Sequence, residues 1–163
     1  MSSKQPATGK TKELKIVTRS VATLADVERS PRLIRLLYVI SLAERGISEK
    51  ALSYLIRELK AQGYDMKYDF MMIGDVPMSR ELQNDILLLR YVGLAENNIK
   101  RKLVITSAGR EFLSKVEGTI PQEERELLRK LYEAVRPKIA PIDAEVEIRA
   151  SARGTGPRRG ARG

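Results

Sequence analysis

The sequence predicts a mainly α protein with a small amount of β structure, an α+β fold with basic ends. Three observations predict it. Apolar residues recur at helical three- and four-residue spacing over most of the chain, and short alternating stretches interrupt that pattern at few places. Good helix caps and glycine stops separate the segments. The length of 163 residues suits one compact domain with tails, which buries about 70% of its surface on folding.

Two helices are expected first. Ser30-Pro31 supplies a cap and a proline at the first helical position, and this helix runs on to a stop at Gly46. Because it is apolar on most sides, we expect it at the centre of the fold. Ser48 caps a second helix that ends at Gly63. Its apolar face carries Leu52, Leu55, Ile56 and Leu59.

The pattern then changes to a period of two. Apolar and polar residues alternate from Tyr64 to Met72, which predicts a half-buried strand or an extended arm. A turn follows at residues 74–77. Ser79 caps a third helix, which Gly93 ends. Four methionines gather around this stretch, and they suit either core packing or a surface covered by another subunit. They are Met66, Met71, Met72 and Met78.

A hairpin and further helices complete the chain. A short strand from Leu94, a turn at Asn97-Asn98 and a strand at 103–105 predict the hairpin. Thr106 caps a helix that Gly118 ends. The next helix spans 119–135 and is closed by Pro137. Alternation from Ile142 to Ile148 predicts an edge strand or a docking arm.

The basic charge belongs to the two ends of the chain. The whole protein has 30 Lys and Arg against 21 Asp and Glu. Residues 1–20 contain five basic residues and one acid, residues 149–163 contain five arginines and no acid, and residues 21–148 are balanced. Cationic ends on a neutral body suit a protein whose tails engage a polyanion.

The composition argues against catalysis. The chain has no Cys, His or Trp, so it has no disulfide framework, no zinc finger and no imidazole base. Gly9-Lys10-Thr11 lacks the earlier glycine of a phosphate-binding loop, because Lys4 stands there. We therefore expect a protein that is not an enzyme and has no cofactor or metal. One alternative is a magnesium site on one face of the predicted last strand, at Asp143, Glu145 and Glu147. A solvated strand edge explains these acids as well.

The order of parts in residues 79–113 is specific. A capped helix ends in Gly93-Leu94, a hairpin with a polar tip follows, and then comes Thr106-Ser-Ala-Gly109 with Phe112 and Leu113. This order resembles the second half of a winged helix-turn-helix domain, which is common among archaeal and bacterial transcription regulators. The resemblance extends more loosely over residues 31–116. It implies a recognition helix at 79–92 and a wing at 95–106.

The resemblance also divides the chain. Residues 1–18 form a basic flexible tail, residues 19–118 a winged-helix domain, residues 119–136 a C-terminal helix, and residues 137–163 an extended arm with an Arg- and Gly-rich tail. Winged-helix regulators commonly pair through helices outside the motif, so the resemblance implies that the C-terminal helix is available for pairing in a homodimer. Its seam would be Leu128, Leu131 and Val135.

The expected function is nucleic-acid binding, with DNA favoured over RNA, by a regulator or a chromatin-associated factor. A helix fits the major groove, while a basic hairpin reaches the neighbouring backbone. The expected contacts on the recognition helix are Arg80, Gln83, Asn84 and Arg90, and those on the wing are Lys100, Arg101 and Lys102. Those in the tail are Arg153, Arg158, Arg159 and Arg162.

A second interpretation stays open beside the first. The recognition helix also contains Glu81 and Asp85, so its net charge is zero. The winged helix would then dock on protein, as in a ribosome- or polymerase-associated subunit, while the tails touch nucleic acid. We expect a cytoplasmic protein, since no apolar run approaches the ~20 residues of a membrane span. Few Asn and Gln beside many charged residues favour a thermophilic source.

Overall fold

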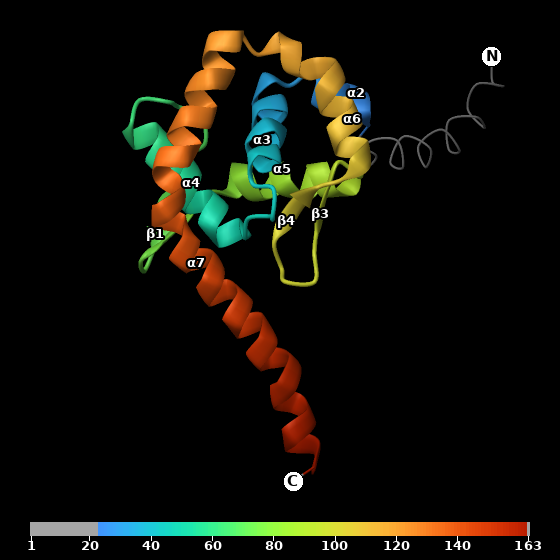
Figure 1. Ribbon diagram of the computed structural model, residues 1–163, viewed down its shortest axis with the longest axis vertical. Coiled ribbons are helices and arrows are strands. Elements are labelled where there is room, and N and C mark those ends of the chain that lie inside the picture. Colours follow the sequence, from blue (N-terminus) through green and yellow to red (C-terminus); the bar gives the residue numbers. More distant parts are fainter. Residues whose placement is uncertain (1–22, 163) are drawn as a thin grey trace, which may run out of the picture.

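The computed structural model describes residues 23–162, with side chains placed as far as residue 152. It confirms a mainly α protein with two small antiparallel hairpins (Figure 1). The predicted tail at 1–18 lies outside the described residues. In chain order the elements are α2 (Leu24–Glu28), α3 (Pro31–Leu42), α4 (Glu49–Ala61), β1 (Met71–Ile73), β2 (Val76–Met78), α5 (Arg80–Tyr91), β3 (Ala95–Asn97), β4 (Leu103–Ile105), α6 (Ser107–Val116), the 3-10 turn η1 (Glu117–Thr119) and α7 (Gln122–Arg162).

Helix α3 is the centre of the core, as its sequence predicts. The Ser30 hydroxyl accepts the Leu33 N–H at 3.2 Å, and Pro31 is the first helical residue. The buried residues of α3 lie around most of the helix circumference, which explains why the sequence of this helix is apolar on most sides. They are Leu33, Ile34, Leu36, Leu37, Tyr38, Val39 and Ile40. Figure 1 shows α6 and α7 on either side of α3.

The connection between α3 and α4 is bonded to the second hairpin. The Ile47 N–H donates to the Leu103 carbonyl at 3.0 Å, and the Leu103 N–H donates to the Ile47 carbonyl at 2.8 Å. Gly46 has a φ of +93°, and a Cβ there would lie 2.8 Å from the Cβ of Lys102. Only glycine fits both restrictions. The base of the β3–β4 hairpin is therefore tied to the α3–α4 pair.

The segment from Tyr64 to Met72 is only partly the strand that the sequence predicts. The alternation of burial is confirmed, because Met66 and Tyr68 are buried while their neighbours are exposed. Of the two alternatives, a strand or an extended arm, the strand is wrong for residues 64–70, because no segment among the described residues pairs with them and Lys67 adopts a φ of +70°. Pairing begins only at β1, whose three side chains are all exposed. The methionines thus divide between core and surface.

The Thr106-x-x-Gly109 motif fixes α6 against the end of α5. The Thr106 hydroxyl accepts the Gly109 N–H at 2.9 Å and donates to the Gly93 carbonyl at 2.6 Å. A Cβ on Gly109 would lie 2.1 Å from the Leu94 carbonyl oxygen. The motif therefore needs threonine for its hydroxyl and glycine for the close approach of two backbones.

Helix α7 differs from its prediction in length and in packing. It begins at Gln122 and continues for 41 residues, so the expected stop at Pro137 is wrong. Pro137 and Pro141 are exposed and one turn apart, so the bonds they remove from the helix face solvent, where water can satisfy the carbonyls. Despite this length, none of the described helices is apolar enough over a sufficient span to cross a membrane.

The proposed dimer seam packs inside the chain. Leu128 and Val135 are fully buried, and Leu131 lies against the same core. Helix α7 covers α4 and α3, which explains why these leucines and valines recur at helical spacing. The assignment of these residues to a seam between two subunits is therefore wrong.

The expected edge strand at Ile142–Ile148 is also wrong, because these residues belong to α7. The extended arm predicted from residue 137 onward is helical for the same reason. Ile142 and Val146 are one turn apart and partly buried, while Ile148 is 67% exposed. The acids between them bind cations and a backbone N–H of the domain, which favours the helix over a free strand.

A polar clamp joins α3, α7 and the loop after α4. The Arg35 guanidinium donates to both oxygens of Glu124, at 2.5 and 3.0 Å, and the Tyr64 hydroxyl donates to the same carboxylate. The hydrogen bonds from Arg35 lower the pKa of Glu124, and the bond from Tyr64 adds to this effect. Each group comes from a different element, so the clamp fixes the start of α7.

Candidate nucleic-acid interface

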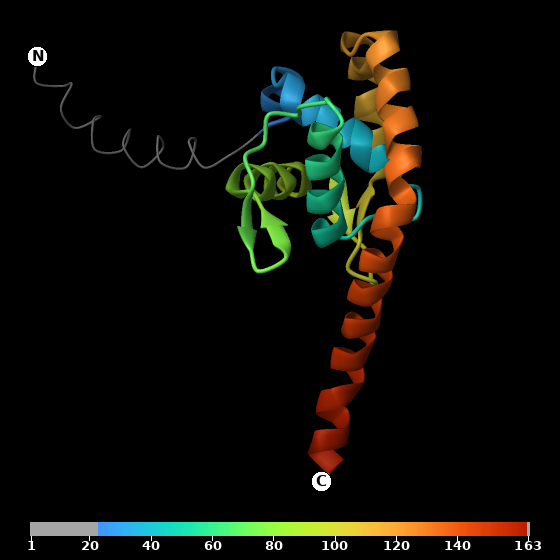
Figure 2. The same cartoon turned by 90° about the vertical axis from the view of Figure 1, so that its left-hand side faces the viewer.

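Helix α5 is held in the domain by its cap and by one apolar face. The Ser79 hydroxyl accepts the Leu82 N–H at 3.2 Å, and Gly93 ends the helix at a φ of +83°. Leu82, Ile86 and Leu89 are buried. In Figure 2, α5 and the β1–β2 hairpin lie on one side of the molecule and α7 lies on the other.

The opposite face of α5 forms a continuous exposed stripe. At about 100° per residue, its six members fall within an arc of about 120°. All four residues that the sequence assigns to nucleic-acid contact on this helix belong to it. The members of this α5 stripe are Arg80, Gln83, Asn84, Leu87, Arg90 and Tyr91.

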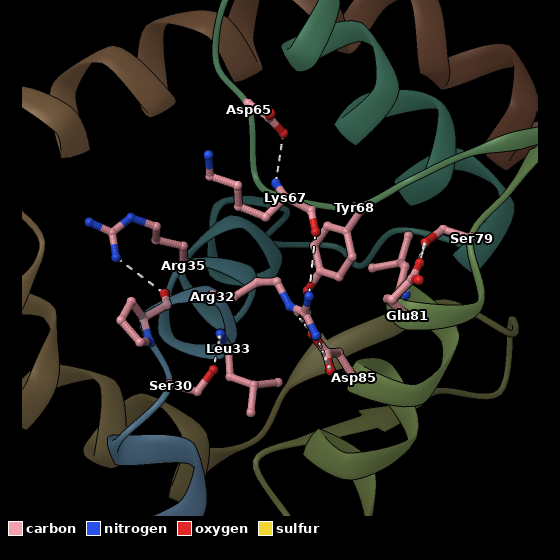
Figure 3. Close-up of polar contacts among 12 residues, drawn as sticks. Ser30, Arg32, Leu33, Arg35, Asp65, Lys67, Tyr68, Ser79, Glu81 and Asp85 are labelled. Atoms are coloured by element: carbon pink, nitrogen blue, oxygen red, sulfur yellow. Dashed lines mark hydrogen bonds and ion pairs between the residues drawn. The ribbon is translucent and has the colours of Figure 1, made fainter.

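Asp85 does not belong to the α5 stripe, because it points into the domain (Figure 3). The Arg32 Nε donates to Asp85 Oδ2 at 2.8 Å, and the Tyr68 hydroxyl donates to the same oxygen at 2.6 Å. The Arg32 guanidinium also lies over the Tyr68 ring, 4.8 Å from its centroid. Burial raises the pKa of Tyr68, and the hydrogen bond to Asp85 raises it further. Tyr68 is thus a neutral donor at physiological pH.

Glu81 is exposed but lies outside the arc of the α5 stripe. Its carboxylate accepts the Ser79 hydroxyl at 3.0 Å. Backbone and Ser79 hydrogen bonds at the helix N-terminus lower its pKa. The α5 stripe therefore carries Arg80 and Arg90 without an acid, although the helix as a whole is neutral. Residue counting misses this asymmetry, and the 100° helical projection is the signal that reveals it.

The β3–β4 hairpin presents the second group of predicted contacts. Asn98 organises its turn, since its side-chain oxygen accepts the N–H groups of Lys100 at 2.9 Å and Lys102 at 3.0 Å. Arg101 adopts a φ of +64°, and its side chain is exposed. Ile99 beside it is 93% exposed. The conformation of the turn is thus fixed by hydrogen bonds to the Asn98 side chain.

Two of the three hairpin cations are already paired with α7. Lys100 Nζ lies 3.3 Å from Glu147 Oε2, and Lys102 Nζ lies 3.3 Å from Glu147 Oε1. The interaction with Lys102, and to a smaller extent that with Lys100, lowers the pKa of Glu147. Sequence reasoning missed Glu147 as a partner of the hairpin because it expected a strand there.

The three acids proposed as a magnesium site serve three separate purposes. Asp143 accepts the Ser48 N–H at 2.7 Å, Glu145 pairs with Lys50 and Arg149, and Glu147 pairs with the hairpin. No group of three metal-binding side chains occurs within the part of the chain that the structure describes. On a helix these residues do not share the single face that the strand prediction gave them.

The tail arginines cannot be placed in the same way. Their positions fall in α7, beyond the last side chain that the structure describes. They are Arg153, Arg158, Arg159 and Arg162. Their assignment to nucleic-acid contact stays a prediction.

Comparison with protein-family models, with curated proteins and with solved structures finds no significant match to this chain.

Proposed function

We propose that residues 19–118 form a winged-helix domain and that the chain is a non-enzymatic protein that binds duplex DNA through α5 and the β3–β4 hairpin. Its biological role would be that of a transcription regulator or a chromatin-associated factor. The order of elements supports the proposal: α3, an extended residue at Ile47, α4, α5, the β3–β4 hairpin and α6, with the β1–β2 hairpin inserted between α4 and α5. In this assignment α5 enters the major groove and the hairpin is the wing.

The observation that carries the proposal is the composition of the α5 stripe. Arg80 and Arg90 sit at its two ends and suit phosphates or guanine edges, while Gln83 and Asn84 suit adenine edges. Asp85 lies outside this face and pairs with Arg32 inside the domain, so no acid of the stripe opposes the phosphates. Leu87 is 60% exposed and suits contact with a thymine methyl group.

The test is a titration of the full chain with duplex DNA and with structured RNA at two salt concentrations. Arg80→Gln should weaken duplex binding and reduce the log-log salt slope by about 0.9, the value for one lost phosphate contact. Arg136→Gln is the matched control, because it removes the same charge from α7 on the other side of the molecule. Equal affinities for the two variants would exclude α5 as the contact.

The wing assignment has its own test. Neutralising Lys100, Arg101 and Lys102 together should weaken duplex binding at low salt. Unchanged affinity would show that the hairpin does not touch the duplex.

A second function is favoured by one observation. Leu87 and Tyr91 of the α5 stripe are about 60% exposed, and such apolar surface also suits a protein partner. The chain would then be an assembly module of a ribosome- or polymerase-associated complex, with nucleic acid held by its tails. Deleting residues 149–163 separates the two functions, because complete loss of binding would favour the assembly module.

A further inference from the structure

The contact between Glu147 and the hairpin joins segments far apart in the chain. One carboxylate bridges two ammonium groups, with each oxygen 3.3 Å from one Nζ atom. The Lys102 side chain is only 16% exposed, while those of Glu147 and Lys100 are 35% and 60% exposed. Solvent, and any larger polyanion, reaches this pair from the open side of Lys100.

Glu147 is not needed to shape the hairpin. Asn98 closes the turn through the N–H groups of Lys100 and Lys102. The base is held by the pairing of β3 with β4 and by the two hydrogen bonds between Ile47 and Leu103. Removal of the Glu147 charge therefore leaves the backbone supports of the hairpin in place.

The Glu147 carboxylate contacts the two ammonium groups to which a phosphate of bound nucleic acid would also be attracted. Lysine binds carboxylates and phosphates alike as a point charge, so the two anions compete for the same Nζ atom. Glu145, two residues before Glu147, also pairs with two cations, Lys50 of α4 and Arg149 of α7. Among the described residues, Arg101 is the one hairpin cation for which no acid partner is found.

We propose that α7 is an autoinhibitory element for the hairpin: Glu147 competes with nucleic-acid phosphates for Lys100 and Lys102. This inference rests on the proposed function, and it adds that α7 regulates nucleic-acid binding at the hairpin. Phosphate contact at these lysines requires Glu147 to be displaced, so the intact chain binds duplex more weakly than its count of cations implies.

The experiment compares full-length Glu147→Gln with full-length Glu133→Gln. Glu133 is a matched control, because it lies on the same helix, is exposed and pairs only with Arg136 among the described residues. Both variants change the net charge equally, so a general electrostatic effect moves them together. Affinity for a duplex of mixed sequence is measured at two salt concentrations, and thermal unfolding verifies that each variant is folded.

Glu147→Gln should bind about three- to tenfold more tightly at low salt, since two ion pairs no longer have to be broken. Its log-log salt slope should steepen by up to about 1.8, the value for two new phosphate contacts. Glu133→Gln should change the affinity by less than about twofold. In a background with both Lys100→Gln and Lys102→Gln, the gain from Glu147→Gln should disappear.

Two outcomes overturn the inference without touching the proposed function. Equal duplex affinity of Glu147→Gln and Glu133→Gln would show that the contact does not compete, and weaker binding by Glu147→Gln would show that Glu147 positions the hairpin instead. Absence of duplex binding by the wild type and by both variants overturns the proposed function together with the inference. Binding by Glu147→Gln alone would support both.

Discussion

Asp85 of α5 accepts a hydrogen bond from Arg32 of α3 at 2.8 Å, and this pair holds the inner face of α5 against the core. The bond joins the centre of the core to the helix that carries the α5 stripe. It also withdraws one acid from the surface of a helix that has two arginines. Stability and the charge of the exposed face thus depend on the same interaction.

Asp85→Ala should destabilise the fold by about 3 kcal/mol, because it leaves Arg32 and the Tyr68 hydroxyl without their acceptor. This loss of stability is at the lower end of the range for breaking a buried ion pair, because the Arg32 side chain is 35% exposed. Urea unfolding measures it. Glu81→Ala on the same helix should cost far less, because its carboxylate is exposed, and a comparable loss there would contradict a special role for Asp85.

Gly109→Ala should destabilise the protein by about 2 kcal/mol or more. The added Cβ would lie 2.1 Å from the Leu94 carbonyl oxygen, and a backbone atom cannot move aside cheaply. Gly118→Ala is the control, because nothing lies within 4 Å of a Cβ at that position. Thermal unfolding distinguishes the two variants, and equal melting temperatures would refute the close approach of α6.

Glu124→Gln should reduce stability in a pH-dependent manner. Hydrogen bonds from Arg35 and Tyr64 lower the pKa of Glu124 in the folded state. A lowered carboxyl pKa contributes stability above the unfolded pKa of about 4.3, and that contribution is lost as the pH falls through the folded-state pKa. The difference in unfolding free energy between wild type and Glu124→Gln should therefore shrink from pH 7 to pH 3.

Glu126→Gln serves as the control for this pH series. Glu126 is exposed and accepts a bond only from Gln122 among the described residues. Glu126→Gln should therefore change the free energy of unfolding only slightly. A difference for Glu124→Gln that does not change with pH would show that its charged form is not stabilised by the fold.

Leu128→Ala should cost about 3 kcal/mol of stability, because the side chain is fully buried between α7 and the core. Leu127→Ala, at a position that is 44% exposed, should cost far less. Urea unfolding gives the energies, and sedimentation gives the oligomeric state. A change of oligomeric state with Leu128→Ala at unchanged stability would restore the seam between subunits.

The local signals in the sequence were sufficient for most elements. The caps at Ser30, Ser48, Ser79 and Thr106 each accept the N–H three residues on, as the predictions require. These signals work because a cap and its target are neighbours in the chain. Pro137 predicted a helix end that does not occur, because α7 continues through it and the hydrogen bond that the proline removes faces solvent.

The sequence by itself determined the α+β class, the order of helices around one hairpin, and the candidate contact residues on α5 and the hairpin. Only the tertiary structure decided which of these charges face solvent. It paired Asp85 of α5 with Arg32 inside the domain, and it placed Glu147 against Lys100 and Lys102, so one acid offsets one of the three positive charges of the hairpin. The physical reason is that caps and periodicity are set by neighbours in the chain, whereas ion pairs are set by packing between distant segments.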